Sequence, residues 1–139
     1  MILNKKLESV LFDLDGTLVD TAPDFIYLLN KLLVENKRIP IDAKDITLRV
    51  SNGARALIEY AFQIDHQHED FADLLGQFLT LYEEKIDKTE SAIYPGIDRL
   101  LEMLNRNEIP WGVVTNKAAL YAEKLLAKFN IFSNCAVLV

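Results

Sequence analysis

The chain has 139 residues, half of them apolar, and a net charge of −6, which allows one domain or a small domain with an insertion. The negative charge argues against a nucleic-acid backbone as the main partner, and no apolar run approaches the roughly 18 residues that a membrane span needs. Residues 1–6 lack the apolar region of a signal peptide and Cys135 is the only cysteine, so we expect a cytoplasmic protein without an internal disulfide.

The first predicted element is a strand over residues 9–13, apolar on both faces like a central strand of a parallel sheet. It runs into the segment Asp13-Leu14-Asp15-Gly16-Thr17-Leu18. Because strand side chains alternate with a period of two, both carboxylates should start on the same side of the strand. They stand at its carboxyl end, where ligands bind in open α/β sheets. Two crowded acids repel each other unless a metal or a substrate offsets the repulsion, so the pattern predicts a catalytic site.

Two other interpretations of this segment fit less well. An Asp-Gly pair often closes a β-hairpin, but the next residues, Thr21-Ala22-Pro23-Asp24, have the features of a helix start rather than of a second strand. A calcium-binding loop has its glycine at the sixth position counted from the first Asp, whereas Gly16 stands at the fourth.

Only helices are predicted between the first strand and residue 92. They cover residues 24–37, about 42–50, 54–62 and 69–88, from apolar stripes at helical spacing and from turn residues between them. This stretch is too long for a simple crossover, so we expect an all-helical insertion. His66 and His68 fall between two of these helices, and without a further ligand cluster they are assigned to a surface loop.

Strand and helix alternate after the turn Tyr94-Pro95-Gly96. A helix over 97–107, a strand over 110–115, a helix over 118–130 and an apolar tail over 136–139 are predicted. This alternation is typical of α/β folds with parallel strands.

The second predicted strand ends in Thr115 and Asn116. If the two strands are neighbours, this hydroxyl and amide face Asp13, and short donors there suit the oxygens of a phosphoryl group. The alternative is that the two residues simply cap the following helix.

Together these motifs resemble those of haloacid dehalogenase-like phosphatases. Residues 13–18 look like the first motif of that family and Val113-Val114-Thr115-Asn116 like its second. Residues 21–24, 51–55 and 111–117 resemble the phosphoglycolate phosphatase branch closely, and its N-acetylmuramic acid 6-phosphate phosphatase relatives at least as well.

The resemblance implies a Rossmann-like parallel sheet core, truncated here, formed by residues 1–20 and 93–139, with an inserted helical cap domain over 21–92. It implies a phosphatase that hydrolyses a small phosphorylated metabolite, either of the 2-phosphoglycolate type or N-acetylmuramic acid 6-phosphate. No nucleic acid or membrane partner is expected.

The resemblance also assigns roles to single residues. Asp13 would be the nucleophile that forms an aspartyl-phosphate, and Asp15 would protonate the departing oxygen and then activate water. Mg²⁺ would be held by the Asp13 carboxylate and the backbone carbonyl of Asp15. The backbone at Gly16, the Thr115 hydroxyl and Asn116 would bind the phosphoryl oxygens.

A second anion site is predicted in the helical insertion. Ser51-Asn52-Gly53 is a turn that opens a helix, and helix N-termini attract anions. Gly53, Ala54 and Arg55 would then meet the non-reacting end of the substrate. The alternative is an ordinary turn between helices with a solvated arginine.

Family members also carry a charge-screening lysine and further metal-binding acids, which would lie beyond Val139. Lys117, Lys124 and Lys128 do not match that lysine. We therefore expect the 139-residue chain to be unstable, to associate through exposed strand edges at 10–12 and 137–139, or to be part of a longer polypeptide. The alternative function is a catalytically inactive fragment that acts by binding or self-association.

Overall fold

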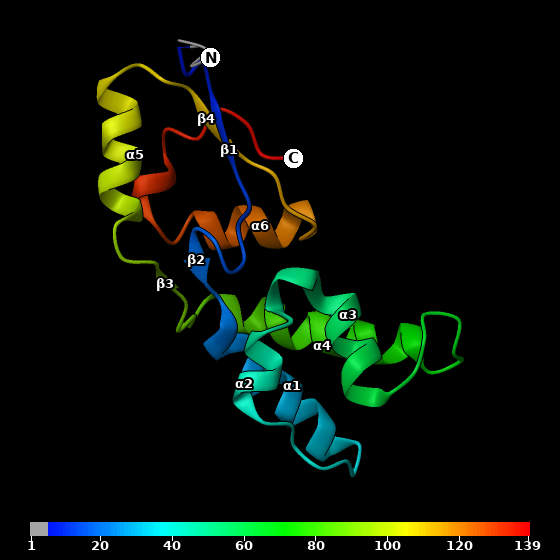
Figure 1. Cartoon of the computed structure of the whole chain (residues 1–139). Helices are drawn as coiled ribbons and strands as arrows, with labels where there is room; N and C mark the ends of the chain where they lie inside the picture. The colour runs from blue at the N-terminus through cyan, green and yellow to red at the C-terminus, as the bar shows by residue number, and fades with distance from the viewer. Residues whose placement is uncertain (1–5) are drawn as a thin grey trace, which may run out of the picture.

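The elements follow one another in chain order in a computed structural model that describes residues 6–139 (Figure 1). Residues 1–5, which include most of the N-terminal segment without signal-peptide features and the start of the predicted core, lie outside the described residues. The elements are β1 (Val10–Phe12), β2 (Val19–Asp20), α1 (Ala22–Glu35), α2 (Ala43–Thr47), the 3₁₀ helix η1 (Val50–Asn52), α3 (Gly53–Phe62), α4 (Phe71–Ile86), β3 (Ala92–Ile93), α5 (Ile97–Arg106), β4 (Trp111–Val113), α6 (Ala119–Leu126) and the 3₁₀ helix η2 (Asn130–Phe132).

A small parallel sheet confirms the predicted α/β class. β1 and β4 pair in parallel, with Phe12 opposite Val113. The C-terminal tail continues the sheet on the other side of β4, where Val113 bridges Leu138 in parallel and donates its N–H to the carbonyl of Val137 at 2.8 Å. The carboxyl ends of the two predicted strands are therefore neighbours.

β1 is an edge strand within the part of the chain that the structure describes, because β4 is its only strand partner there. Leu11 is consequently 63% exposed, and Val10 and Phe12 are only partly buried. The expectation of a central strand buried on both faces is wrong for this chain, whereas the expected exposed edge is present.

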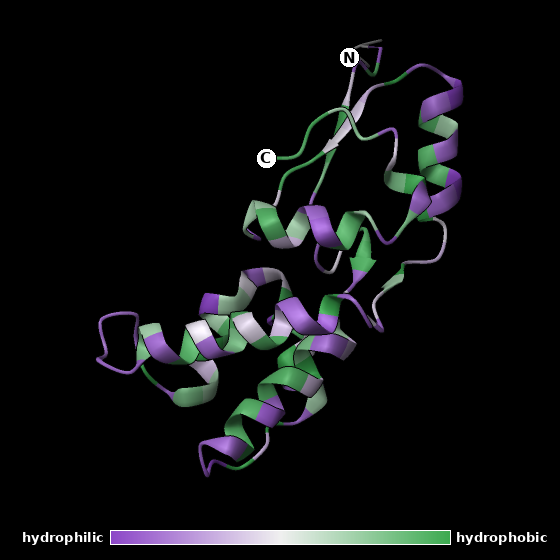
Figure 2. Ribbon diagram, turned by 180° about the vertical axis from the view of Figure 1, so that it is seen from behind, coloured by the Kyte–Doolittle hydropathy of each residue, from purple (hydrophilic) through white to green (hydrophobic). Residues whose placement is uncertain are grey.

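The apolar side chains gather in two clusters. One is formed by residues 22–86, from α1 to α4, and the other by residues 14–19 and 101–132. In the first, the Phe25 ring stacks on Phe78 and Tyr82, with centroid distances of 5.9 and 4.9 Å. Figure 2 shows the mixture of apolar and polar residues around the helices, as amphipathic packing requires. No helix among residues 6–139 is long and apolar enough to cross a membrane.

A short antiparallel pair joins the two groups and was not predicted. β2 and β3 lie side by side, with Val19 opposite Ile93. They are the two places where the chain passes between the helices α1–α4 and the remaining elements (Figure 1). α6 lies between the parallel strands and this helical group.

The helix starts lie within two residues of the predicted ones, but one cap differs. Asp42 accepts a hydrogen bond from the Lys44 N–H at 2.8 Å and caps α2 as expected. Thr21 occupies the N-cap of α1 with Pro23 in the first turn, yet its side chain makes no capping bond. Its hydroxyl donates instead to a carboxylate described below. His66 and His68 lie on an exposed loop, as predicted.

Candidate active site

The two carboxylates of the first motif lie in different environments. Asp13 is exposed, and its Oδ1 accepts the Leu14 N–H at 2.8 Å. Asp15 is only 3% exposed. The prediction that both share one side of the strand is wrong as stated, because β1 ends at Phe12 and strand alternation does not continue through the turn.

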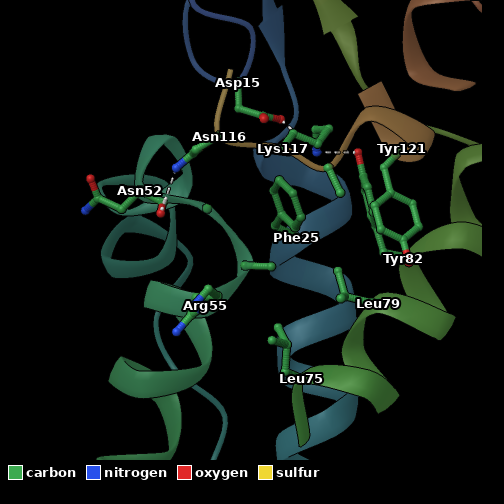
Figure 3. Close-up of a pocket in the computed structure, with 13 residues that line it drawn as sticks. Asp15, Phe25, Asn52, Arg55, Leu75, Leu79, Tyr82, Asn116, Lys117 and Tyr121 are labelled. Atoms are coloured by element: carbon green, nitrogen blue, oxygen red, sulfur yellow. Dashed lines mark hydrogen bonds and ion pairs between the residues drawn. The ribbon is translucent and has the colours of Figure 1, made fainter. Parts of the chain in front are cut away.

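Asp15 is held by donors from three segments, of which Figure 3 shows Lys117. Its Oδ1 accepts a hydrogen bond from the Thr21 hydroxyl at 2.8 Å and lies 3.2 Å from the Lys117 ammonium. The backbone carbonyl of Asp15 accepts a bond from the Ser51 hydroxyl at 3.2 Å. Both side-chain contacts fall on the same oxygen, so the carboxylate is fixed from one side.

Lys117 is buried between aromatic rings. Its ammonium donates to the Tyr82 hydroxyl at 2.9 Å and lies 4.3 Å and 4.8 Å from the ring centroids of Tyr82 and Phe25. Burial lowers the pKa of the Lys117 ammonium, although the charge of Asp15 acts in the opposite direction. Burial also raises the pKa of the Tyr82 hydroxyl, and the charge of Asp15 adds to this effect.

The second motif stands at the end of β4. The Thr115 hydroxyl accepts the Lys117 N–H at 3.1 Å, and Asn116 donates its side-chain amide to the Asn52 carbonyl at 3.1 Å. The N-cap of α6 is Ala118. Thr115 and Asn116 therefore do not act as the cap of the next helix, which removes the simpler of the two interpretations of this motif.

Gly16 allows a tight approach between the two groups of elements. Its φ is +79°, and a Cβ atom there would lie 2.6 Å from the Ser51 hydroxyl, so a larger residue would displace the turn. Its N–H donates to the Val19 carbonyl at 3.0 Å. A phosphoryl oxygen would have to displace that bond to be held by this N–H.

A cavity of about 270 Å³ opens between the first motif, the second motif and the helices (Figure 3). It brings Asp15 and Asn116 together with all three residues predicted for the far end of a substrate. Asp13, Gly16 and Thr115 are not among its lining residues. The lining consists of Asp15, Phe25, Asn52, Gly53, Ala54, Arg55, Leu75, Leu79, Tyr82, Asn116, Lys117, Ala118 and Tyr121.

Arg55 contributes to this cavity from the first turn of α3. The residue is exposed, and its guanidinium lies 5.7 Å from the centroid of the Phe71 ring. Arg55 was predicted to meet the non-reacting end of the substrate, and its position in the cavity lining is compatible with that role.

The donors predicted for Mg²⁺ are hard oxygens, which this ion prefers. They are one carboxylate, that of Asp13, and one backbone carbonyl, that of Asp15. No group of three or more His, Cys, Asp or Glu that could hold a metal lies among residues 6–139. Mg²⁺ sites commonly use one or two carboxylates, with water and phosphate oxygens as further ligands, and the two donors fit such a site.

Sequence reasoning missed the donors to Asp15, which are Lys117, Thr21 and Ser51, and it missed Tyr82, which holds Lys117. Lys117 was compared only with the lysine of another family motif, although its place directly after Thr115 and Asn116 at a strand end signals proximity to the site. Tyr82 belongs to the apolar stripe of a predicted helix. Its hydroxyl was the one sign of a polar contact, because a buried tyrosine usually finds a hydrogen-bond partner.

Comparison with known proteins gives two kinds of relative. The chain is 36% identical over 134 residues to N-acetylmuramic acid 6-phosphate phosphatase of Pseudomonas putida, covering 96% of this chain and 60% of that protein. It is also 36% identical over 134 residues to phosphoglycolate phosphatase of Xanthomonas campestris pv. campestris, covering 94% and 58%. The chain thus spans about 60% of the length of these relatives.

Solved structures show the same fold. The crystal structure of a predicted phosphoglycolate phosphatase from Haemophilus somnus has a TM-score of 0.83 at 25% identity, covering 98% of this chain and 63% of that one. A predicted phosphatase from Clostridium acetobutylicum has a TM-score of 0.84 at 22% identity, covering 97% and 61%.

The family profile described as haloacid dehalogenase-like hydrolase matches residues 10–139, nearly the whole chain, and includes both motifs that meet at the cavity. The chain therefore belongs to the haloacid dehalogenase-like hydrolase family.

Proposed function

We propose that this chain carries the reaction centre of a Mg²⁺-dependent phosphatase that hydrolyses a small phosphorylated metabolite through an aspartyl-phosphate. The observation that carries the proposal is the placement of Asp15, a buried carboxylate in the turn after β1 that lines a cavity together with Asn116 from the loop after β4. Ligands bind at the carboxyl ends of parallel strands, and the motifs and relatives support the same chemistry.

In this proposal the phosphoryl group binds where the cavity meets the loop that carries Asp13. An Asp13 oxygen attacks phosphorus, and the bond from phosphorus to the leaving oxygen breaks as Asp15 gives that oxygen a proton. Asp15 then takes a proton from water, whose oxygen attacks phosphorus and releases Asp13 and inorganic phosphate. Thr115 and Asn116 would hold the phosphoryl oxygens.

Mg²⁺ would be held by the Asp13 carboxylate and the Asp15 carbonyl. When bound, it neutralises the charge that otherwise keeps a carboxylate away from a phosphate dianion. The Ser51 hydroxyl, which donates to the same carbonyl, helps to orient it.

We further propose that residues 21–92 form a cap domain over a core made of residues 1–20 and 93–139. Two separate apolar clusters support this division, since one belongs to α1–α4 and the other to the remaining elements. The chain crosses between them at β2 and β3 only. In this arrangement the cavity is the substrate site between cap and core.

The direct test is release of inorganic phosphate by the purified protein. We expect release from 2-phosphoglycolate or from N-acetylmuramic acid 6-phosphate, assayed side by side with Mg²⁺, and loss of that release when EDTA removes the metal. Both substrates pair a phosphate with a carboxylate, so the ratio of their kcat/KM values decides the substrate class. Absence of release from every phosphomonoester tested would contradict the proposal.

Arg55→Ala tests the far end of the substrate site. We expect KM for a carboxylated phosphate to rise about tenfold with little change in kcat, because the arginine would contribute binding that is equal in the ground and transition states. Ethyl phosphate, which has no carboxylate, should be unaffected. Arg49→Ala is the matched control, since Arg49 stacks on Tyr60 at 3.7 Å outside the cavity. An unchanged KM in Arg55→Ala would remove Arg55 from the site.

Self-association without catalysis is the second candidate, and the exposed Leu11 on the edge strand β1 favours it. Leu11→Lys should weaken association of the 139-residue chain about tenfold or more in sedimentation velocity, because it removes a leucine that the association would bury and places a charge on the edge. Leu48→Lys is the control, as Leu48 is 70% exposed and lies away from the strands. A wild-type chain that is monomeric at all concentrations would contradict this candidate.

A further inference from the structure

We propose that Lys117 is a positioning residue for the Asp15 carboxylate, held in place by the Tyr82 hydroxyl of α4. This inference rests on the proposed function, because it concerns the carboxylate that would exchange protons with the leaving oxygen and with water. The three side chains lie together at one end of the cavity (Figure 3).

The first support is the geometry around Asp15. Lys117 and Thr21 both contact Oδ1, at 3.2 and 2.8 Å. Rotation of the carboxylate away from this orientation would break both contacts at once. Oδ2 is thereby left as the oxygen that would face the reacting group.

The second support is the way in which Lys117 itself is fixed. Its backbone N–H donates to the Thr115 hydroxyl at 3.1 Å, which anchors it to the second motif. Its side chain is only 6% exposed, and its ammonium lies against the rings of Phe25 and Tyr82. A long, flexible side chain is thus confined to one direction, which a positioning role requires.

The third support is the origin of Tyr82. This residue belongs to α4, in the helical group, whereas Asp15 and Lys117 follow β1 and β4. The bond between the Tyr82 hydroxyl and Lys117 therefore makes the orientation of Asp15 depend on how the helical group is seated. Buried ion pairs add little net stability by themselves, so stability alone does not account for this arrangement.

The test compares leaving groups in the full polypeptide chain with Mg²⁺. A misplaced proton donor slows the loss of an alkoxide strongly, but slows the loss of 4-nitrophenolate little. In Lys117→Met we expect kcat for an alkyl phosphate to fall about 10–100-fold, with KM changed by less than about threefold. With 4-nitrophenyl phosphate, a rapid burst of 4-nitrophenolate should precede slow turnover, since hydrolysis of the aspartyl-phosphate still needs Asp15.

Two further variants complete the test. Tyr82→Phe keeps the ring and removes only the hydroxyl, so it should show the same pattern with a smaller loss. It decides the question if Lys117→Met does not fold. Lys124→Met is the matched control, because Lys124 also pairs with an acid of α4, Glu83, but on the surface. Its kinetics should match those of the wild type.

Several results would overturn the inference. An unchanged kcat in both Lys117→Met and Tyr82→Phe would overturn it. Equal falls in the burst rate and in the turnover rate, for both leaving groups, would also overturn it, because they would indicate a merely structural role. A rise in KM alone would assign Lys117 to phosphate binding instead. If the wild-type protein released no phosphate, or if its phosphate release did not depend on Asp13, the proposed function itself would have failed. That result is distinguishable from all of these.

Discussion

Asp13→Asn is expected to lower phosphate release by about 10⁴-fold. The amide has the shape of the carboxylate but is not a nucleophile toward phosphorus, and it also removes the charged oxygen that would hold Mg²⁺. Because Asp13 is exposed, the melting temperature should change little. Phosphate release and a thermal melt on the same preparation therefore separate lost chemistry from lost folding.

Asp20→Asn is the control for that loss. Asp20 lies in the same part of the chain, and its Oδ1 accepts the Ala22 N–H at 3.2 Å, a bond that an asparagine oxygen can still accept. Its activity should stay within about twofold of the wild type, as for a surface change away from the reacting atoms. If Asp13→Asn kept most of the wild-type rate, the aspartyl-phosphate mechanism would be wrong.

Helices and the main strand pairing could be predicted because they leave long or adjacent signals in the sequence. α4 repeats apolar residues over four turns, and its observed bounds differ by two residues at each end from the predicted 69–88. The parallel pairing of β1 with β4 follows from alternating strand and helix signals. The ends of the strands were predicted less accurately. Asp13 was predicted as the last residue of the first strand, but it is a charged, exposed residue that follows the end of β1 at Phe12.

The β2–β3 pair could not be predicted from a sequence pattern. Each strand has two residues, so neither can display alternation, and Asp20 and Ala92 are paired although 72 positions separate them. The contact between Lys117, which pairs with Asp15, and Tyr82 is a similar case. Lys117 and Tyr82 lie on different elements, and only the packing of α4 against the loop after β4 brings the ammonium and the hydroxyl within 2.9 Å.

Asp24 is a further residue whose role depends on distant partners. In the sequence it is an acid in the first turn of a helix, a position that normally interacts with the helix dipole at the surface. In the structure it is fully buried, at 0% exposure. Its carboxylate accepts hydrogen bonds from the Thr89 hydroxyl, from the Glu90 N–H at 2.9 Å and from the Ser91 hydroxyl at 3.1 Å. These residues precede β3, so Asp24 connects the start of α1 to the segment where the chain leaves the helical group.

Asp24→Ala should lower the free energy of unfolding by about 3 kcal/mol, because it leaves three donors at residues 89–91 without their acceptor, of which the Ser91 hydroxyl is buried and the other two are partly buried, and a buried donor without a partner costs about 1–3 kcal/mol. Asp98→Ala is the matched control. Asp98 occupies the first turn of α5 but is exposed, so its loss should cost about 0.5 kcal/mol or less. Urea denaturation of both variants and the wild type measures the difference. Equal effects of the two substitutions would mean that the buried bonds of Asp24 add nothing beyond the helix dipole.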